Sequence, residues 1–261
     1  MDSFRPAFED LDLHLTEICW DDADVDWSRF DAVIIGTTWD YWDRSELFLE
    51  TLRQIESQTR LFNSSELVRW NSDKKYLLEF ANRDVKLIPT VWIDEPNPMA
   101  VEKAFASLGC EEIVLKRQIG AGAKGQHLLR VGEDVPKLMH PMMAQPFFQS
   151  IQRTGELSMI FVDGEFCHGL IKRAAQGDYR IQSAYGGTEE AVSVSEADQA
   201  AARQVLAGLT EIPLYARVDM IWGDSGELFL MELEVIEPYL YPLEGPQLGQ
   251  RMAAAIAERL T

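Results

Sequence analysis

The alternation of hydrophobic and polar residues predicts helices and strands mixed along the whole chain. Strands are predicted where apolar residues alternate with polar ones or form short runs, and helices where apolar residues recur every three or four positions. The predicted strands are 11–18, 31–35, 85–93, 111–117 and 126–131, and the predicted helices are 45–58, 73–83, 98–108, 195–209 and 247–260. Ser45 and Ser72 are candidate N-caps, and Gly109 is expected to end its helix.

Two antiparallel hairpins are predicted in the second half of the chain. In 158–173 the pair Asp163-Gly164 separates two apolar runs, which is typical of a tight hairpin turn. In 215–235 the segment 223–226 separates two further apolar strands. Hairpins combined with helices favour an α+β fold over a purely parallel, doubly wound sheet.

The composition narrows the class of protein. The 261 residues include 24 basic and 43 acidic side chains, a net charge of −19, so the basic footprint of a nucleic-acid-binding protein is absent. No stretch approaches the roughly 18 apolar residues of a membrane helix, and the N-terminus shows no secretory signal. Three scattered cysteines indicate free thiols in a reducing compartment. We expect a cytoplasmic protein that acts on small molecules without nucleic acid or membrane; whether it forms a homodimer is left open.

A glycine-rich loop at 120–125 reads G-A-G-A-K-G and joins two predicted strands. A dinucleotide-binding loop would be followed by a helix, and a Walker A loop would continue with Lys and then Ser or Thr, so neither motif fits. Glycines between antiparallel strands can instead form a flap whose backbone N–H groups approach phosphate oxygens. Lys116 on the incoming strand could reach the α- and β-phosphates. The alternative is a surface hairpin without a ligand.

Three acidic residues are expected on one face of the second hairpin. If Trp222 faces Glu227 across the loop, residue 219 lies opposite residue 230, and side chains alternate between faces at a period of two. One face then carries Asp219, Leu230, Glu232 and Glu234. Three carboxylates among apolar residues need a cation, and hard oxygen ligands of this kind suit Mg²⁺. The alternative is a solvated acidic face.

Several motifs, in their order along 70–261, resemble the ATP-grasp ligases, and specifically the branch with glutathione synthetase and the ribosomal-protein-modifying glutamate ligases. The motifs are NSDKKYLL, VLKRQIGAGAKG, QPFFQS, TGELSMIF, GDYRIQSAYGG, and RVDMIW followed by FLMELEV. The resemblance implies an ATP-grasp fold, in which two α+β subdomains clasp ATP. It also implies a magnesium-dependent ligase that activates a carboxylate as an acyl phosphate, which an amine then captures to form a C–N bond.

The resemblance further implies a role for particular residues. Lys116 and Arg180 would be catalytic, and Arg180 would reach the transferring phosphate or the substrate. The nucleotide-binding residues would be Lys74, Lys116, Gly120, Gly122, Gly125, Gln145, Phe147, Phe148, Glu156 and Lys172. Glu156 would hold the ribose, and Lys172 could face the triphosphate or be an ordinary surface charge. The ligands of one or two Mg²⁺ ions, or of Mn²⁺, would be Asp219, Glu232 and Glu234.

Two departures from the family pattern affect these expectations. The last metal ligand of the family is usually Asn in an E-x-N pattern, and Glu234 stands there in this chain. The family also begins with a strand-helix unit that is not recognisable before 11–18, which indicates a trimmed N-terminal domain. We expect a small α/β unit at 1–68, an ATP-grasp subdomain with the flap at 69–144, and a C-terminal subdomain with the metal site at 145–261.

Three further motifs suggest a group within the superfamily. GTTWDYW, VRWNSDKKYLL and ELEVIEPYLY are similar to a group that includes the O-ureidoserine cyclo-ligase of cycloserine biosynthesis, which implies capture within one small amino acid derivative. In the first motif, Asp40 and Arg44 could meet a small amino acid, although its aromatic residues could simply cap the core. The alternative function is a degenerate ATP-grasp module that binds nucleotide as a regulator or as a non-catalytic subunit.

Overall fold

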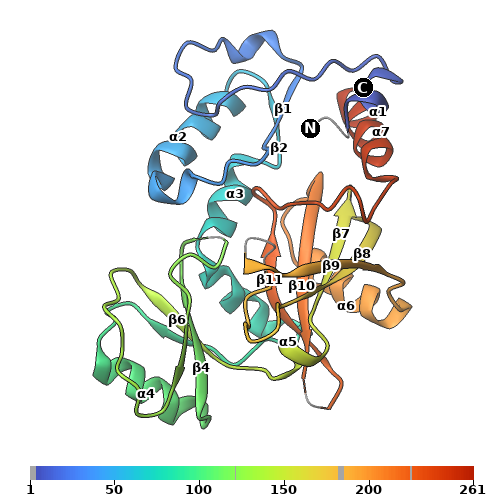
Figure 1. The fold of residues 1–261 in the computed structure, drawn as a ribbon. Helices are drawn as coiled ribbons and strands as arrows, with labels where there is room; N and C mark the ends of the chain where they lie inside the picture. The colour runs from blue at the N-terminus through green and yellow to red at the C-terminus, as the bar shows by residue number, and fades with distance from the viewer. Residues whose placement is uncertain (1–3, 121, 182–184, 224) are drawn as a thin grey trace.

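The structure, a computed structural model, describes residues 4–120, 122–181, 185–223 and 225–261. In this part of the chain, one two-stranded, one four-stranded and one five-stranded sheet lie among helices, as Figure 1 shows. The mixture of helices with largely antiparallel sheets confirms the predicted α+β class. None of the described helices is both long and apolar enough to cross a membrane.

The N-terminal unit is a small α/β arrangement. Strand β1 (Ala32–Ile34) pairs in parallel with β2 (Arg60–Phe62), and α2 (Ser45–Glu56) connects them. The strand and helix predicted here are confirmed, and four apolar residues of α2 are buried at helical spacing: Phe48, Leu49, Leu52 and Ile55. Short 3-10 helices η1 (Trp27–Arg29) and η2 (Tyr41–Asp43) flank β1. Ser45 begins α2 rather than capping it, because the N-cap position belongs to Arg44, whose side chain makes no capping bond.

The strand predicted at 11–18 is wrong, since these residues form an extended segment without a neighbouring strand. The alternation that suggested a strand is nevertheless real. Leu13 and Leu15 pack against the cluster around helix α7 (Leu248–Leu260), while the residues between them face solvent. Helix α1 (Arg5–Glu9) precedes this segment and packs on α7, which brings the two ends of the chain together (Figure 1).

The helix predicted at 73–83 is a 3-10 helix, η3 (Lys74–Asn82), and an α-helix, α3 (Ser65–Ser72), precedes it. Asp73 separates the two because its backbone is extended, and its side chain accepts a hydrogen bond from the N–H of Lys75. Ser72 therefore ends α3 instead of capping the next helix. The cap of α3 is Ser64, whose hydroxyl accepts from the N–H of Leu67.

A four-stranded sheet follows, with the order β3-β6-β4-β5. Its strands are β3 (Val91–Ile93), β4 (Glu112–Arg117), β5 (His127–Arg130) and β6 (Met142–Pro146). Helix α4 (Pro98–Leu108) packs on it, begins at the Asn97 cap and ends at Gly109, whose φ of 63° is left-handed. Because β5 is a strand paired antiparallel with β4, the glycine-rich loop joins two strands as predicted.

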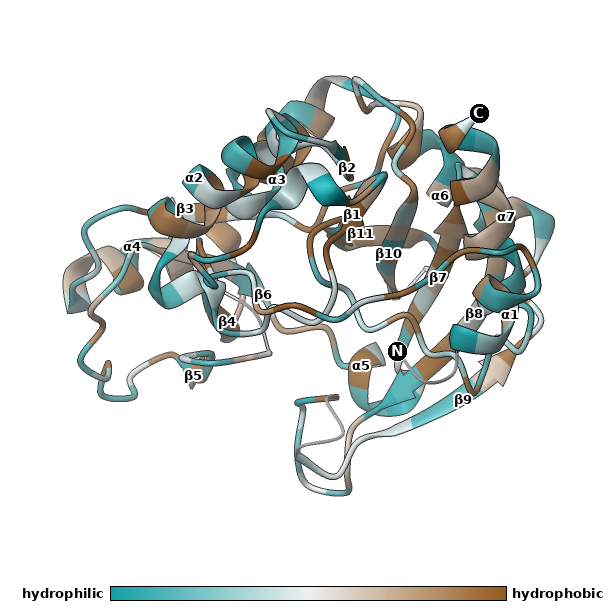
Figure 2. Cartoon of the chain, turned by 90° about the horizontal axis from the view of Figure 1, so that it is seen from above, coloured by the Kyte–Doolittle hydropathy of each residue, from teal (hydrophilic) through white to brown (hydrophobic). Residues whose placement is uncertain are grey.

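The five-stranded sheet has the order β11-β10-β7-β8-β9. Its strands are β7 (Glu156–Val162), β8 (Glu165–Arg173), β9 (Thr188–Val192), β10 (Tyr215–Trp222) and β11 (Leu228–Glu234), with the short helix α5 (Ser150–Arg153) before β7. Side chains of β7 alternate between faces: Met159 and Phe161 pack with α6 (Glu196–Leu206) and η3, whereas Ile160 and Val162 pack with α7. Helices α2 and α3 show hydrophilic and hydrophobic colours in Figure 2, as expected of helices with one buried side.

The register of the second hairpin differs from the prediction. Trp222 faces Leu228 rather than Glu227, and a bulge after Asp219 places Glu232 opposite Asp219. The shifted register pairs Leu230 with Met220 in the core, so Leu230 does not share the acidic face. The shifted register alone would have put Glu232 and Glu234 on the face opposite to Asp219. The extra residue of the bulge reverses this, so Asp219, Glu232 and Glu234 remain on one side.

Strand β11 lies at the edge of its sheet, and its outer backbone groups are bonded to other segments. The hydroxyl of Tyr76 accepts from the N–H of Leu233 (2.8 Å) and donates to its carbonyl (3.1 Å). Asn71 donates to the same carbonyl (2.8 Å) and accepts from the N–H of Val235 (3.2 Å). Further along, the N–H of Leu230 donates to the carbonyl of Lys86 (2.8 Å). This strand is therefore fixed along its outer side as well as by β10.

Candidate active site

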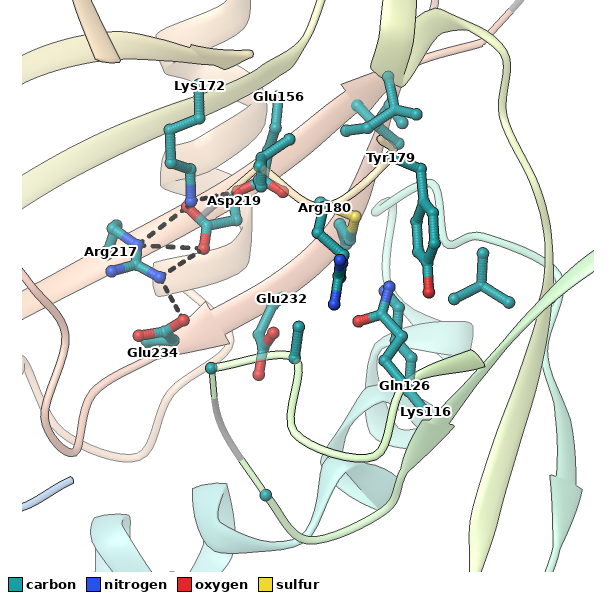
Figure 3. A pocket seen from close by; sticks show the side chains of 18 of the residues that line it. Lys116, Gln126, Glu156, Lys172, Tyr179, Arg180, Arg217, Asp219, Glu232 and Glu234 are labelled. Carbon is teal, nitrogen blue, oxygen red and sulfur yellow. Dashed lines mark hydrogen bonds and ion pairs between the residues drawn. The ribbon is translucent and has the colours of Figure 1, made fainter. Parts of the chain in front are cut away.

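A cavity of about 610 Å³ lies between the four-stranded and five-stranded sheets and reaches the N-terminal unit. Most of the sequence-predicted site residues line it: Lys74, Lys116, Gly120, Gly122, Gln145, Phe147, Phe148, Glu156, Lys172, Arg180, Asp219, Glu232 and Glu234. Gly125 is not among the lining residues. Further residues line the cavity that the sequence motifs did not indicate as site residues, among them Arg117, Gln126, Tyr179, Arg217, Glu237, Tyr239 and Tyr241. Residues far apart in the sequence thus form one concave surface, shown close up in Figure 3.

The two predicted nucleotide lysines differ in what they contact. The ammonium of Lys74 is 2.9 Å from Glu232 and donates to the carbonyl of Gly120 (2.6 Å), so it ties the glycine loop to β11. Burial acts to lower the pKa of Lys74, but the Glu232 carboxylate outweighs it and the pKa is raised. Lys116 on β4 has no hydrogen bond or ion pair with any described residue, and burial lowers its pKa. Lys116 is therefore a cation without an anion, directed into a cavity.

The glycine-rich loop covers one side of the cavity and contacts the N-terminal unit. Lys124 forms an ion pair with Asp43 of η2 (3.0 Å) and lies 5.8 Å from the centre of the Trp42 ring. Gly122 has a φ of 63°, a left-handed conformation that favours glycine, although a side chain would meet no neighbour there. Because both partners of the ion pair are more than half exposed, it adds little stability and can open readily.

A buried charge cluster forms the floor of the cavity. The ammonium of Lys172 contacts Glu156 and lies 3.4 Å from Asp219, which also accepts a hydrogen bond from Ser158. Burial acts to raise the pKa of Asp219, but the adjacent Arg217 and Lys172 outweigh it and hold this pKa well below its usual range. Burial raises the pKa of Glu156 to about 7. Lys172 is thus a buried member of an ion-pair network, and the interpretation as a surface charge is wrong.

Arg217 completes the cluster from β10. Its guanidinium donates to both oxygens of Asp219, at 3.0 and 2.9 Å, and to Glu234 on the neighbouring strand (Figure 3). Burial raises the pKa of Glu234 to about 7, although Arg217 acts to lower it. The sequence contained the signal for Arg217: it lies two positions before Asp219 on a strand, and a period of two puts both on one face.

The prediction that the three carboxylates need a metal ion for charge neutralisation is changed. The three carboxylates do share a face, but protein cations already neutralise them: Lys74 for Glu232, Arg217 for Glu234, and Lys172 with Arg217 for Asp219. Among the described residues, no three His, Cys, Asp or Glu side chains are grouped closely enough to hold a metal ion. Glu232 and Glu234 are each 28% exposed toward the cavity, whereas Asp219 is 3% exposed. The two glutamates supply the hard oxygen donors that fit Mg²⁺ together with oxygens of a ligand.

The opposite end of the cavity is aromatic. The ring of Phe147 meets that of Tyr179 edge to face, with centroids 6.1 Å apart. Gln145 is buried and donates to the hydroxyl of Thr90 (3.0 Å). A flat apolar slot with a few fixed polar groups suits a nucleobase. Arg180, which also lines the cavity, is held by three side-chain hydrogen bonds to Asp178, and these bonds lower the pKa of the Asp178 carboxyl group.

The third side of the cavity comes from the N-terminal unit and from the loop after β11. Trp39 donates from its ring nitrogen to the carbonyl of Glu237 (3.0 Å), and its ring lies 6.3 Å from that of Tyr239. Asp40 and Arg44 were expected to meet a substrate here, but they do not line the cavity. Arg44 instead pairs with Asp40 (2.7 Å) and Asp21 (2.6 Å), and its guanidinium lies 4.6 Å from the centre of the Trp20 ring.

Comparison with known proteins agrees with this architecture. Residues 1–63 match the sequence model of the N-terminal domain of D-cycloserine synthetase DcsG, and residues 108–239 match that of the prokaryotic glutathione synthetase ATP-grasp domain. The cycloserine biosynthesis protein DcsG of Streptomyces lavendulae is 30% identical over 264 residues, covering 94% of this chain and 88% of that protein. A glutathione synthetase of Parasynechococcus marenigrum is 25% identical over 233 residues, covering 82% and 67%.

Solved structures of DcsG and of another ATP-grasp ligase are also similar to this chain. The crystal structure of D-cycloserine synthetase DcsG superimposes with a TM-score of 0.87 and 27% identity, covering 100% of this chain and 94% of that chain. The ATP-grasp ligase PsnB, in a complex with Mg and ADP, shares the fold at a TM-score of 0.62 and 16% identity, covering 84% and 68%. The chain belongs to the ATP-grasp ligases, in the group of D-cycloserine synthetase. The family resemblance, the ATP-grasp fold and the assignment as an ATP-binding ligase are therefore confirmed.

Proposed function

We propose that the chain uses ATP to phosphorylate a substrate carboxylate and that an amine then captures the acyl phosphate, forming a C–N bond. The observation that carries this proposal is the unpaired Lys116 beside a glycine loop, across the cavity from the Glu232 and Glu234 carboxylates. The lysine is suited to the ATP phosphates, and the glutamates are suited to a cation that accompanies those phosphates. The division into units 1–68, 69–144 and 145–261 is part of the proposal, in which the last two units clasp ATP.

Each side of the cavity would have a distinct task. The slot around Phe147 would bind the adenine, and Lys74, Lys116 and the loop at 120–125 would hold the phosphates. Arg180 and Arg217 would stabilise the charge that develops as the γ-phosphoryl group moves to the carboxylate. When bound, Mg²⁺ would neutralise phosphate charge at Glu232 and Glu234, with Asp219 behind them. The loop at 120–125 would exclude water, which would otherwise hydrolyse the acyl phosphate.

The relative DcsG is named a D-cycloserine synthetase, which favours a small amino acid derivative as substrate and capture within the same molecule. Intramolecular capture needs no separate acceptor, because proximity replaces it. We propose that the chain cyclises a small amino acid derivative in this way. Two-substrate ligation, in which a carboxylate and a free amine meet in the cavity, is the alternative that the glutathione synthetase relatives support.

The test is substrate-stimulated ADP release with Mg-ATP. Amino acids that carry a second nitrogen nucleophile on the side chain are supplied alone, and simple amino acids are supplied in pairs with amines. We expect ADP and phosphate from a single compound of the first kind, together with a cyclic product by mass spectrometry. Release only with pairs would favour the two-substrate alternative. No stimulated ADP with any compound, while Mg-ATP still binds, would contradict the proposal.

A second prediction concerns the metal. Glu232→Gln is expected to remove most of the difference in Tm between protein with Mg-ATP and protein with ATP and a chelator, because the amide keeps the shape but loses the metal-binding charge. Differential scanning fluorimetry measures this directly. Glu189→Gln is the matched control, since Glu189 lines the same cavity from β9 and is given no metal role. An unchanged magnesium-dependent shift in Glu232→Gln would show that Glu232 is not a ligand.

A further inference from the structure

One buried acid of the cavity forms no ion pair with a described residue. Glu156, Asp219, Glu232 and Glu234 each contact a lysine or an arginine. The side chain of Glu237 forms no ion pair with any described residue, although Glu237 is only 8% exposed and lines the cavity. Burial, with the nearby Glu234 carboxylate, raises the pKa of Glu237 well above its usual range. A buried acid without an ion-pair partner is costly to ionise, and a cationic ligand that enters the cavity would stabilise its charged form.

The surroundings of Glu237 point to the chemistry of that partner. Glu237 lies in the loop after β11, and its carbonyl is fixed by the ring nitrogen of Trp39 (3.0 Å). The ring of Trp39 lies 6.3 Å from that of Tyr239, both residues line the same cavity, and they are 50% and 42% exposed. Aromatic faces next to a carboxylate attract an organic cation, because the ring quadrupole and the negative charge act together. A strongly hydrated metal ion would gain little from the rings.

Glu237 is also close to the reacting centre of the proposed function. Its pKa is affected by Glu232, Glu234 and Lys74, which lie at the phosphate end of the cavity. A small molecule with its ammonium at Glu237 could therefore place its own carboxylate near the γ-phosphate.

We propose that Glu237, with Trp39 and Tyr239 lining the same cavity, binds the protonated amino group of the carboxylate substrate. This inference rests on the proposed function and adds the residue that would distinguish an amino acid from a simple carboxylic acid. An ammonium held by Glu237 has no free electron pair, so the nitrogen that captures the acyl phosphate is a different one on the substrate.

The test compares amino acids with their des-amino analogues. The probes are D- and L-serine with 3-hydroxypropionate, and D- and L-2,3-diaminopropionate with 3-aminopropionate, titrated calorimetrically in the presence of magnesium and a non-hydrolysable ATP analogue. Wild type is expected to bind at least one amino acid about 10- to 100-fold more tightly than its analogue, as for a charged hydrogen bond. Glu237→Gln should remove this preference while affinity for the analogue and for ATP stays unchanged.

The matched control is Glu244→Gln, since Glu244 belongs to the same loop and lines the same cavity; it should keep the amino-acid preference. Equal affinity of wild type for every amino acid and its analogue would overturn the inference, and so would an unchanged preference in Glu237→Gln. Loss of the magnesium dependence of ATP affinity in Glu237→Gln would also overturn it, because Glu237 would then be a metal ligand. Selective amino-acid binding without any ADP release would leave Glu237 as assigned and count against the proposed ligation instead.

Discussion

Replacing Arg217 with methionine is expected to destabilise the protein by about 3–5 kcal/mol, because it leaves buried carboxylates without their counter-charge. Arg217 is 7% exposed, and its guanidinium bonds to Asp219, to Glu234 and to the carbonyl of Tyr239 (3.1 Å). Turnover should fall by more than about 10²-fold, as for the loss of one fixed donor to developing charge. Urea unfolding monitored by tryptophan fluorescence measures the first effect, and ADP release measures the second.

The double variant Arg217→Met/Asp219→Asn separates the two effects. It removes the uncompensated charge at position 219, and Lys172 still has Glu156 as its partner. At least half of the lost unfolding free energy should return, while turnover should not. A single variant that loses less than about 1 kcal/mol, which is typical of an exposed ion pair, would contradict the assignment of a buried, stability-determining network.

Lys116→Ala is expected to weaken ATP binding by about 10- to 100-fold without lowering the stability of the free protein. In the free protein the ammonium forms no ion pair with a described residue, so removing it breaks no existing ion pair. With ATP bound, the same ammonium would gain phosphate oxygens. Calorimetric titration with Mg-ATP gives the affinity, and thermal unfolding without ligand gives the stability.

Lys75→Ala is the matched control, because Lys75 lies beside Lys74 but pairs with Asp94 at the surface (2.8 Å) and does not line the cavity. It should bind ATP as wild type does. If Lys116→Ala also retains wild-type affinity, the nucleotide does not lie on β4 and the proposed orientation of ATP is wrong.

Much of the fold was predictable, because local patterns determined the elements concerned. The turn Asp163-Gly164, the glycine end of α4 and the apolar spacing of α2 each act within a few residues. The errors have a tertiary cause. The segment 11–18 has the alternation of a strand, but a strand needs a neighbour, and its own sequence cannot show that none lies beside it. The 3-10 form of η3 likewise follows a break at Asp73, where the N–H of Lys74 donates to the distant Gln118 carbonyl (2.9 Å).

The part of the candidate site that lies within one hairpin or one loop could be predicted from the sequence. The acidic residues of the second hairpin were placed on one face, although the bulge after Asp219 was not foreseen. Their neutralisation could not be predicted, because Lys74 and Lys172 come from η3 and β8, whose distance from β11 only the fold defines. Glu237 could not be selected from the sequence either. That it is buried without an ion-pair partner depends on the folded structure, and in the sequence it is one glutamate among many.

The covered edge of β11 has a consequence for fragments of this chain. The groups that bond its outer side belong to Asn71, Tyr76 and Lys86, all of which precede the matched ATP-grasp segment 108–239. A fragment cut to that segment would keep β11 but expose a row of unpaired N–H and C=O groups. Such a row is a template for a further strand, so the fragment would be prone to edge-to-edge aggregation. Asn71, Tyr76 and Lys86 thus prevent a sixth strand from pairing with β11.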